Sequence, residues 1–142
     1  MELWLTYALL SAIMAALVAI FGKIGLQGID SGAATAIRAV IMAIFLVGVA
    51  FFQSKGEQIQ NILSDKRALF WIALSGIVGS LSWLFYFMAL KYGKVSQVAP
   101  VDKLSVVIAA ILAILFLHEK ISLLATGGIL LITIGVIMVA LG

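Results

Sequence analysis

Three ionisable residues interrupt stretches of sequence that are otherwise apolar. Arg38 lies in one such stretch, and Asp102 and Lys103 stand side by side near the start of another. Charges this deep in apolar sequence are costly and usually face a bundle interior or a wet cavity. The pattern predicts an Arg38–Asp102 ion pair with Lys103 nearby. The alternative is that Arg38 and Lys103 extend outward to lipid headgroups while Asp102 sits at a frayed helix end.

The other residue types that support catalysis are scarce. The sequence has no cysteine, a single histidine and six acidic residues spread along the chain. Thiol chemistry, disulfides and cysteine-based metal sites are therefore excluded, and one imidazole cannot build a catalytic or metal centre alone. We expect no enzymatic activity, no metal and no cofactor.

The composition indicates a membrane protein. Of the 142 residues, 65% are hydrophobic and 11% are charged, whereas a soluble domain is roughly 45–50% apolar and about 25% charged. A soluble body of this size could not bury that much apolar surface. The nine Lys and Arg residues are scattered in ones and twos, which excludes nucleic acid as a partner. The partner we expect is the lipid bilayer.

The spacing of charges predicts an all-α integral membrane protein with five transmembrane helices. A helix needs about 20 apolar residues to cross a bilayer, and the apolar segments are continuous, unlike the alternating strands of a β-barrel. Between the second and third helices, Ile59, Ile62 and Leu63 predict a short interfacial helix. Ser64 or Asp65 could cap the third long helix, and Ser122 the fifth. The predicted spans are residues 3–22, 32–52, 68–90, 96–117 and 122–141.

Two of these helices bring the three charges to a similar depth. The second and fourth helices begin on the same side of the membrane, which places Arg38, Asp102 and Lys103 roughly 9–10 Å from that side. Pro100 precedes the acidic residue. It either kinks the fourth helix or lies in its first turn, where proline is tolerated. Both interpretations stay open.

An aromatic stretch late in the third helix includes Trp83 and Tyr86. Trp83 is too deep for an interfacial belt, so these rings either line a pocket or pack against protein or lipid. An aromatic pocket favours apolar or cationic substrates. The basic residues Arg38, Lys103 and Lys23 favour anionic or zwitterionic ones. The two indications oppose each other.

Small residues at helical spacing favour close helix contacts. Gly76 with Ser80, and Gly79 with Ser75, are such pairs in the third helix. Gly128 and Gly135 are one heptad apart in the last helix and suit a dimer seam. We interpret Gly76, Gly79, Ser80, Gly128 and Gly135 as packing or dimer positions.

The basic residues of the loops give almost no preferred orientation. Five spans put the termini on opposite faces, and Lys/Arg in loops normally mark the cytoplasmic side. The loops on the N-terminal face hold four such residues and those on the other face hold three. A chain without this bias can insert both ways, and two antiparallel copies would then form a ten-helix body with inverted symmetry, an arrangement common in transporters.

The segment from Phe85 to Ser122 resembles a known family. It contains Phe-Tyr-Phe-Met-Ala-Leu-Lys-Tyr-Gly, then Pro100-Val-Asp-Lys-Leu-Ser and Phe-Leu-His-Glu-Lys-Ile-Ser, followed by a glycine-rich helix. This pattern is similar to the EamA domain of the drug/metabolite transporter superfamily, and Arg38 also fits. Most members of that family carry two such units, whereas this sequence carries one. It resembles the half-length, five-helix bacterial and archaeal branch.

The resemblance implies a multi-pass transporter in a prokaryotic plasma membrane that exports small organic metabolites or drugs by alternating access. It implies that two chains pair, as an antiparallel homodimer or as a heterodimer with a related chain. If transport is coupled to proton movement, Asp102 is the best-placed acid. The residues that we expect along the transport pathway are Arg38, Asp102, Lys103, Trp83, Tyr86 and Pro100. The alternatives are an obligate heteromeric half-transporter, a lipid flippase and a non-transporting membrane scaffold.

Overall fold

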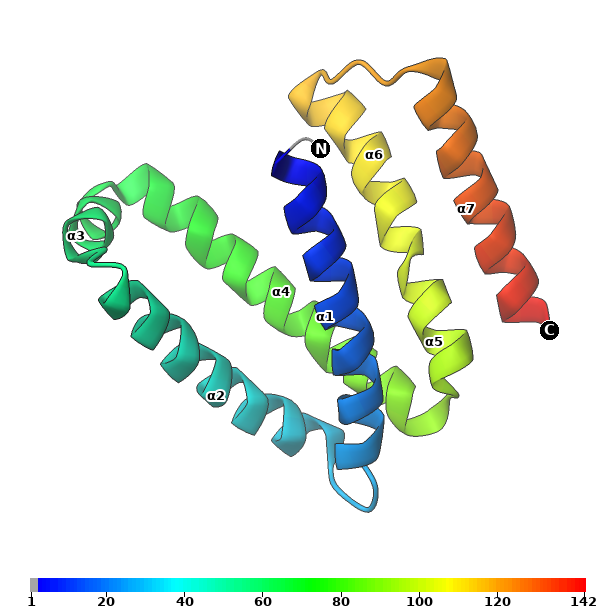
Figure 1. The fold of residues 1–142 in the computed structure, drawn as a ribbon, viewed down its shortest axis with the longest axis horizontal. Helices are drawn as coiled ribbons and strands as arrows, with labels where there is room; N and C mark the ends of the chain where they lie inside the picture. The colour runs from blue at the N-terminus through cyan, green and yellow to red at the C-terminus, as the bar shows by residue number, and fades with distance from the viewer. Residues whose placement is uncertain (1–2) are drawn as a thin grey trace. The chain divides into compact units, whose positions relative to one another are not determined.

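Residues 3–142 are described by a computed structural model, and every regular element in that range is an α-helix (Figure 1). Five stretches are long and apolar enough to cross a membrane: α1, α2, α4, the consecutive pair α5 and α6, and α7. The all-α fold with five spans is therefore confirmed. The helices are α1 (Leu3–Gly25), α2 (Ser31–Phe52), α3 (Gly56–Ser64), α4 (Lys66–Tyr92), α5 (Val95–Asp102), α6 (Leu104–Leu117) and α7 (Leu123–Leu141).

Side-chain caps fix where three of the helices begin. Asp30 accepts a hydrogen bond from the Ala33 amide at 2.9 Å and starts α2. Asp65 accepts from the amides of Arg67 and Ala68 and starts α4. Ser122 accepts from the Ala125 amide at 3.2 Å and starts α7. These contacts satisfy amides that a helix leaves unpaired at its first turn. Of the two predicted caps for α4, Asp65 and not Ser64 caps the helix, and the predicted cap Ser122 of α7 is confirmed.

The helix ends differ from the predicted ends where lysine was taken as a boundary. Helix α1 continues through Lys23 to Gly25, and α4 runs from Lys66 to Tyr92 rather than from 68 to 90. A long lysine side chain can stay on a helix and still reach water. Charge spacing therefore gives the extent of the apolar core of a span, and the helix itself can extend beyond it.

The fourth predicted helix, residues 96–117, is two helices rather than one. Helix α5 ends at Asp102 and α6 begins at Leu104, and Pro100 lies inside α5. Proline lacks an amide hydrogen and its ring crowds the preceding turn. At the break, the Lys103 amide bonds to the Pro100 carbonyl at 2.9 Å and the Val106 amide to the Lys103 carbonyl at 3.0 Å. These tighter three-residue turns favour the kink over the first-turn interpretation.

Helix α6 ends at a residue in an unfavourable backbone conformation. His118 has φ 55° and ψ 32°, in the left-handed region, and its amide bonds to the Ala113 carbonyl. The Glu119 amide bonds to the same carbonyl at 3.2 Å. Glycine is the usual residue at such a position because a β-carbon is disfavoured there. His118 thus ends α6 and lies in the connection to α7.

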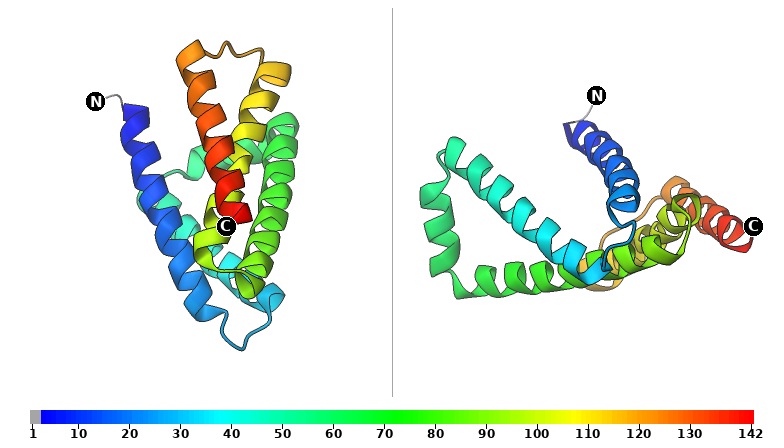
Figure 2. Two further views of the ribbon diagram at one scale, coloured as in Figure 1. Left: turned by 90° about the vertical axis from the view of Figure 1, so that its right-hand side faces the viewer. Right: turned by 90° about the horizontal axis from the view of Figure 1, so that it is seen from below.

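The chain forms two compact units, residues 3–22 with Tyr92–Gly142, and Lys23–Lys91. In the first unit, α7 packs against both α5 and α6. In the second unit, α3 joins the distant ends of α2 and α4, and these two long helices converge toward their other ends (Figure 2). Helix α3 contains Ile59, Ile62 and Leu63, so the short helix predicted between the second and third spans is present.

Few side chains are buried in either unit. Among residues 3–142, the buried apolar side chains are Ala19, Leu26, Phe87, Leu90 and Val136. Large residues such as Phe52 and Leu123 are about 90% exposed, at 89% and 92%. In water each such residue would cost roughly 1.5–3 kcal/mol relative to burial. Lipid has to supply the apolar surroundings that the fold does not.

Candidate functional site

Arg38 lies over an aromatic surface within the Lys23–Lys91 unit. Its guanidinium carbon is 3.6 Å from the centroid of the Trp83 ring and 5.2 Å from that of Phe87. The side chain extends from the first half of α2 to the last third of α4. An arginine over tryptophan is attracted by the ring quadrupole, by about 2 kcal/mol or more when water is excluded.

The aromatic surface is built by one face of α4. Trp83, Tyr86 and Phe87 are three and four residues apart, which places them together on a helix. Their ring centroids are 5.7 Å apart for Trp83 and Tyr86 and 6.0 Å for Trp83 and Phe87, both edge-to-face. Phe87 is 4% exposed, whereas Trp83 and Tyr86 are half-buried. We call Arg38, Trp83, Tyr86 and Phe87 the arginine–aromatic cluster.

Within this unit Arg38 has no acidic partner. The acidic residues of Lys23–Lys91 are Asp30, Glu57 and Asp65, and none of them forms an ion pair or hydrogen bond with Arg38. Asp30 and Asp65 are engaged as helix caps. Within this unit the guanidinium is therefore held by ring faces and not by an anion. Its predicted pairing with Asp102, a residue of the other unit, stays a prediction.

Asp102 and Lys103 meet at the break between α5 and α6. The Lys103 ammonium donates to the Asp102 carboxylate at 3.2 Å, and the two side chains are 36% (Asp102) and 52% (Lys103) exposed. Such an exposed pair contributes little to stability. Pro100 stands two residues before the pair and lies in α5. The sequence singled out Pro100, Asp102 and Lys103, and the structure places all three at the break between α5 and α6.

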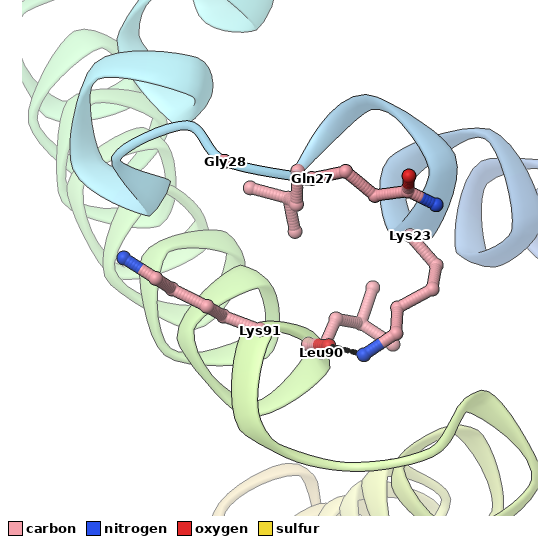
Figure 3. Close-up of a pocket in the computed structure, with 6 residues that line it drawn as sticks. Lys23, Gln27, Gly28, Leu90 and Lys91 are labelled. Carbon is pink, nitrogen blue, oxygen red and sulfur yellow. Dashed lines mark hydrogen bonds between the residues drawn. The ribbon is translucent and has the colours of Figure 1, made fainter.

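A pocket of about 280 Å³ opens where the α1–α2 loop passes the end of α4 (Figure 3). The Lys23 ammonium donates to the Leu90 carbonyl, and Leu90 is fully buried. The Lys91 side chain extends away from that hydrogen bond (Figure 3). A lysine on the last carbonyls of a helix complements the negative end of its dipole. Lys23 therefore ties the end of α1 to the end of α4. The pocket is lined by Lys23, Leu26, Gln27, Gly28, Leu90 and Lys91.

The small residues predicted for packing face open space. A β-carbon at Gly76, Gly79, Gly128 or Gly135 would meet no described atom within 4 Å. Ser80 donates its hydroxyl to the Gly76 carbonyl at 2.8 Å, within its own helix. These positions leave room for a close partner, and their role in packing or dimerisation stays a prediction.

Sequence reasoning missed Phe87 as a member of the site and missed the contact between Arg38 and Trp83. The signal for Phe87 was its four-residue spacing from Trp83. Only the convergence of α2 and α4 brings Arg38 to these rings. For metals, no three His, Asp or Glu side chains gather within residues 3–142, and the expected absence of metal and cofactor stays a prediction.

The fold and the exposed apolar surface define a multi-pass α-helical membrane protein. The model of the EamA-like transporter family matches residues 2–141, so the chain belongs to that family. It is 40% identical to an uncharacterized transporter in the cobO 3' region of a Sinorhizobium species, over 96% of both chains. It is 30% identical to the uncharacterized transporter YvbV of Bacillus subtilis, over 93% of this chain and 43% of that protein.

An uncharacterized protein of Methanocaldococcus jannaschii is 34% identical over 56% of this chain and 58% of its own length. No solved structure matches the chain. Family and relatives together identify a membrane transporter of the prokaryotic plasma membrane.

Proposed function

We propose that this transporter is a secondary exporter of small organic metabolites or drugs and that two antiparallel copies form its ten-helix unit. The observation that carries the proposal is that all five spans lie within one match to the family model, over residues 2–141. Its Sinorhizobium relative is covered over 96% of its length, whereas the longer Bacillus transporter is covered over 43%. A second copy of this chain would supply the other five helices of the ten-helix unit. The proposal assigns no catalytic step to any residue.

Two features support this arrangement. The loops give a nearly even Lys/Arg count on the two faces, so neither orientation is favoured by the positive-inside rule. The arginine–aromatic cluster places a charge and three rings in the membrane-spanning part of α2 and α4. Transporters bind their substrates inside the membrane, near the midplane where repeated halves meet.

The orientation can be tested with reporters fused after Gly142. One fusion carries a fluorescent protein that is active only in the cytoplasm, and the other carries a phosphatase that is active only outside it. Comparable signals from both fusions are expected for dual insertion. Signal from one fusion alone would contradict the antiparallel homodimer and direct the search to a different five-helix partner.

Export is tested separately by comparing metabolites in the medium of cells that express the wild-type chain or the Arg38→Gln variant. We expect at least one small organic compound to accumulate outside in the wild type and to fall severalfold in the variant at equal membrane expression. Identical media would contradict the transport role of this cluster. A matched control is Arg67→Gln, which alters an arginine at the exposed start of α4.

A further inference from the structure

We propose that the Arg38 guanidinium, held against Trp83, binds the acidic group of the transported compound, and that the substrates are organic anions bearing a carboxylate or a phosphate. The inference rests on the proposed transport function and narrows its substrate class. It starts from the contact between one cation and one ring, which the sequence alone did not predict.

The contact with Trp83 uses the flat face of the guanidinium. A distance of 3.6 Å from the guanidinium carbon to the ring centroid is a stacking distance. The five N–H donors of arginine lie in the plane of the group and point outward from its edges. No oxygen of the Lys23–Lys91 unit accepts from them. These donors match a carboxylate or phosphate, which arginine binds with two parallel hydrogen bonds.

The same contact argues against a cationic substrate on Trp83. An aromatic ring attracts a cation through its face, but here Arg38 already covers the Trp83 face and lies 5.2 Å from Phe87. A second cation at these rings would meet the charge of Arg38 at close range, and that repulsion is strong where water is sparse. Of the two opposed indications in the sequence, the geometry favours the anionic one.

The charges around the cluster also favour an anionic substrate. Lys23 and Lys91 lie at the end of the unit where α2 begins and α4 finishes, beside the pocket shown in Figure 3. The carboxylate at this end, Asp30, is engaged with the Ala33 amide. Basic groups at this end of the unit raise the local concentration of anions. The half-buried ring of Tyr86 provides apolar surface for the body of the same ligand.

Binding can be measured with Trp83 as the single fluorescent reporter. The sequence has three tryptophans, so the full chain carrying Trp4→Phe and Trp71→Phe, in lipid vesicles, reports only Trp83. The probes are phenylacetate and phenyl phosphate, with phenylacetamide and phenethylammonium as neutral and cationic matches. We expect saturable changes with an acid and at least about tenfold weaker binding of the amide, the ratio that one charge-assisted hydrogen bond gives. The two acids show whether carboxylate or phosphate is preferred.

Variants then assign the binding to Arg38. Arg38→Gln is expected to abolish the response to the acids, and Arg38→Lys to weaken it, because lysine keeps the charge without the planar fork. Arg38→Lys decides the question if Arg38→Gln does not fold. The proposal is overturned if the amide or the ammonium probe binds as tightly as the acids, if neither acid gives a saturable response, or if Arg38→Lys binds the acids unchanged. It is also overturned if acids bind only after Asp102→Asn, which would mean that Asp102 occupies the guanidinium.

Failure of this inference is distinguishable from failure of the proposed function. The binding measurement needs neither net flux nor a particular orientation. Acid binding without export would retain the anion site and contradict the transport proposal. Export of cations by a chain that binds no acid would retain transport and contradict the anion site.

Discussion

A single arginine in a membrane span has to be accommodated by its neighbours. Arg38 obtains a ring face from Trp83 at 3.6 Å and a second ring, Phe87, at 5.2 Å. Ring faces attract the cation without neutralising it. A carboxylate partner would instead cancel the charge. Within the Lys23–Lys91 unit the cluster therefore keeps its positive charge, which is the property that the proposed anion site needs.

A double-mutant cycle tests whether this contact stabilises the fold. We expect Arg38→Gln and Trp83→Leu to be coupled by about 0.5–2 kcal/mol in the free energy of unfolding, measured by SDS titration in mixed micelles. The control cycle pairs Arg38→Gln with Trp71→Leu, because Trp71 is exposed and contacts Phe70 instead. Strict additivity in the Arg38–Trp83 cycle would contradict the stacking interaction.

At the scale of elements, the break between α5 and α6 is the main departure from regular helix. Pro100 cannot donate to the turn before it, and the chain continues through two tight turns around Lys103. The Asp102–Lys103 ion pair lies at this break. Non-helical backbone in a membrane is tolerated where protein or water satisfies it, so a break at this position is suited to a wet pathway.

Replacing the proline tests its role in the break. We expect Pro100→Ala to restore the missing backbone bond and to make residues 95–117 one continuous helix. Amide hydrogen exchange near Lys103 should then slow by about tenfold or more, because one hydrogen bond contributes roughly 1 kcal/mol or more where water is scarce. Val101→Ala is the matched control. Unchanged exchange in Pro100→Ala would assign the break to another cause.

The end of α6 allows a stabilising substitution. His118 has φ 55°, and a left-handed conformation costs a residue with a β-carbon roughly 1–2 kcal/mol. His118→Gly should therefore raise the thermal unfolding temperature in detergent, and His118→Val should lower it because a branched β-carbon is worse still. A higher stability of the valine variant would contradict the assigned conformation.

At the scale of the whole molecule, most large apolar side chains of residues 3–142 are exposed and need lipid or protein around them. Gly128 and Gly135 on α7 are exposed and have open space around them, beside the face that packs on α5 and α6. They are seven residues apart, so they lie within about 20° on one helix face and about 10 Å apart along it. That stripe fits a close contact with a second copy.

Cysteine cross-linking tests the contact and its direction. The sequence has no cysteine, so each introduced thiol is unique. Because α7 spans Leu123–Leu141, an antiparallel pair of these helices would place Gly128 of one copy opposite Gly135 of the other. We expect co-expressed Gly128→Cys and Gly135→Cys chains, with different tags, to form a mixed disulfide in membranes.

Self-linked Gly128→Cys and Gly135→Cys dimers without the mixed product would indicate a parallel pair. Gly48→Cys is the control, since it lies on α2 in equally open space. Cross-linking of this control to the same extent would mean that the products arise from random collisions, and the seam on α7 would be rejected.

Much of the fold follows from local patterns in the sequence. Apolar runs long enough to cross a bilayer can only be helices or barrel strands, because lipid offers backbone groups no partners. The caps at Asp65 and Ser122 follow from residue type and position, because a polar side chain just before a helix can accept from the unpaired amides of its first turn. Helix ends were less predictable, since Lys23 and Lys66 stay on helices and reach water through long side chains.

The candidate site was also predictable only in part. Residue type and spacing were enough to single out Arg38, Trp83 and Tyr86, because a charge or a deep ring in an apolar span is conspicuous. Their mutual contact was not predictable, since Arg38 and Trp83 are far apart in the chain and meet only where α2 and α4 converge. The number of spans is thus a local property of hydrophobic runs. The partner of each buried charge is decided by tertiary packing, because contacts across helices depend on where the helices cross.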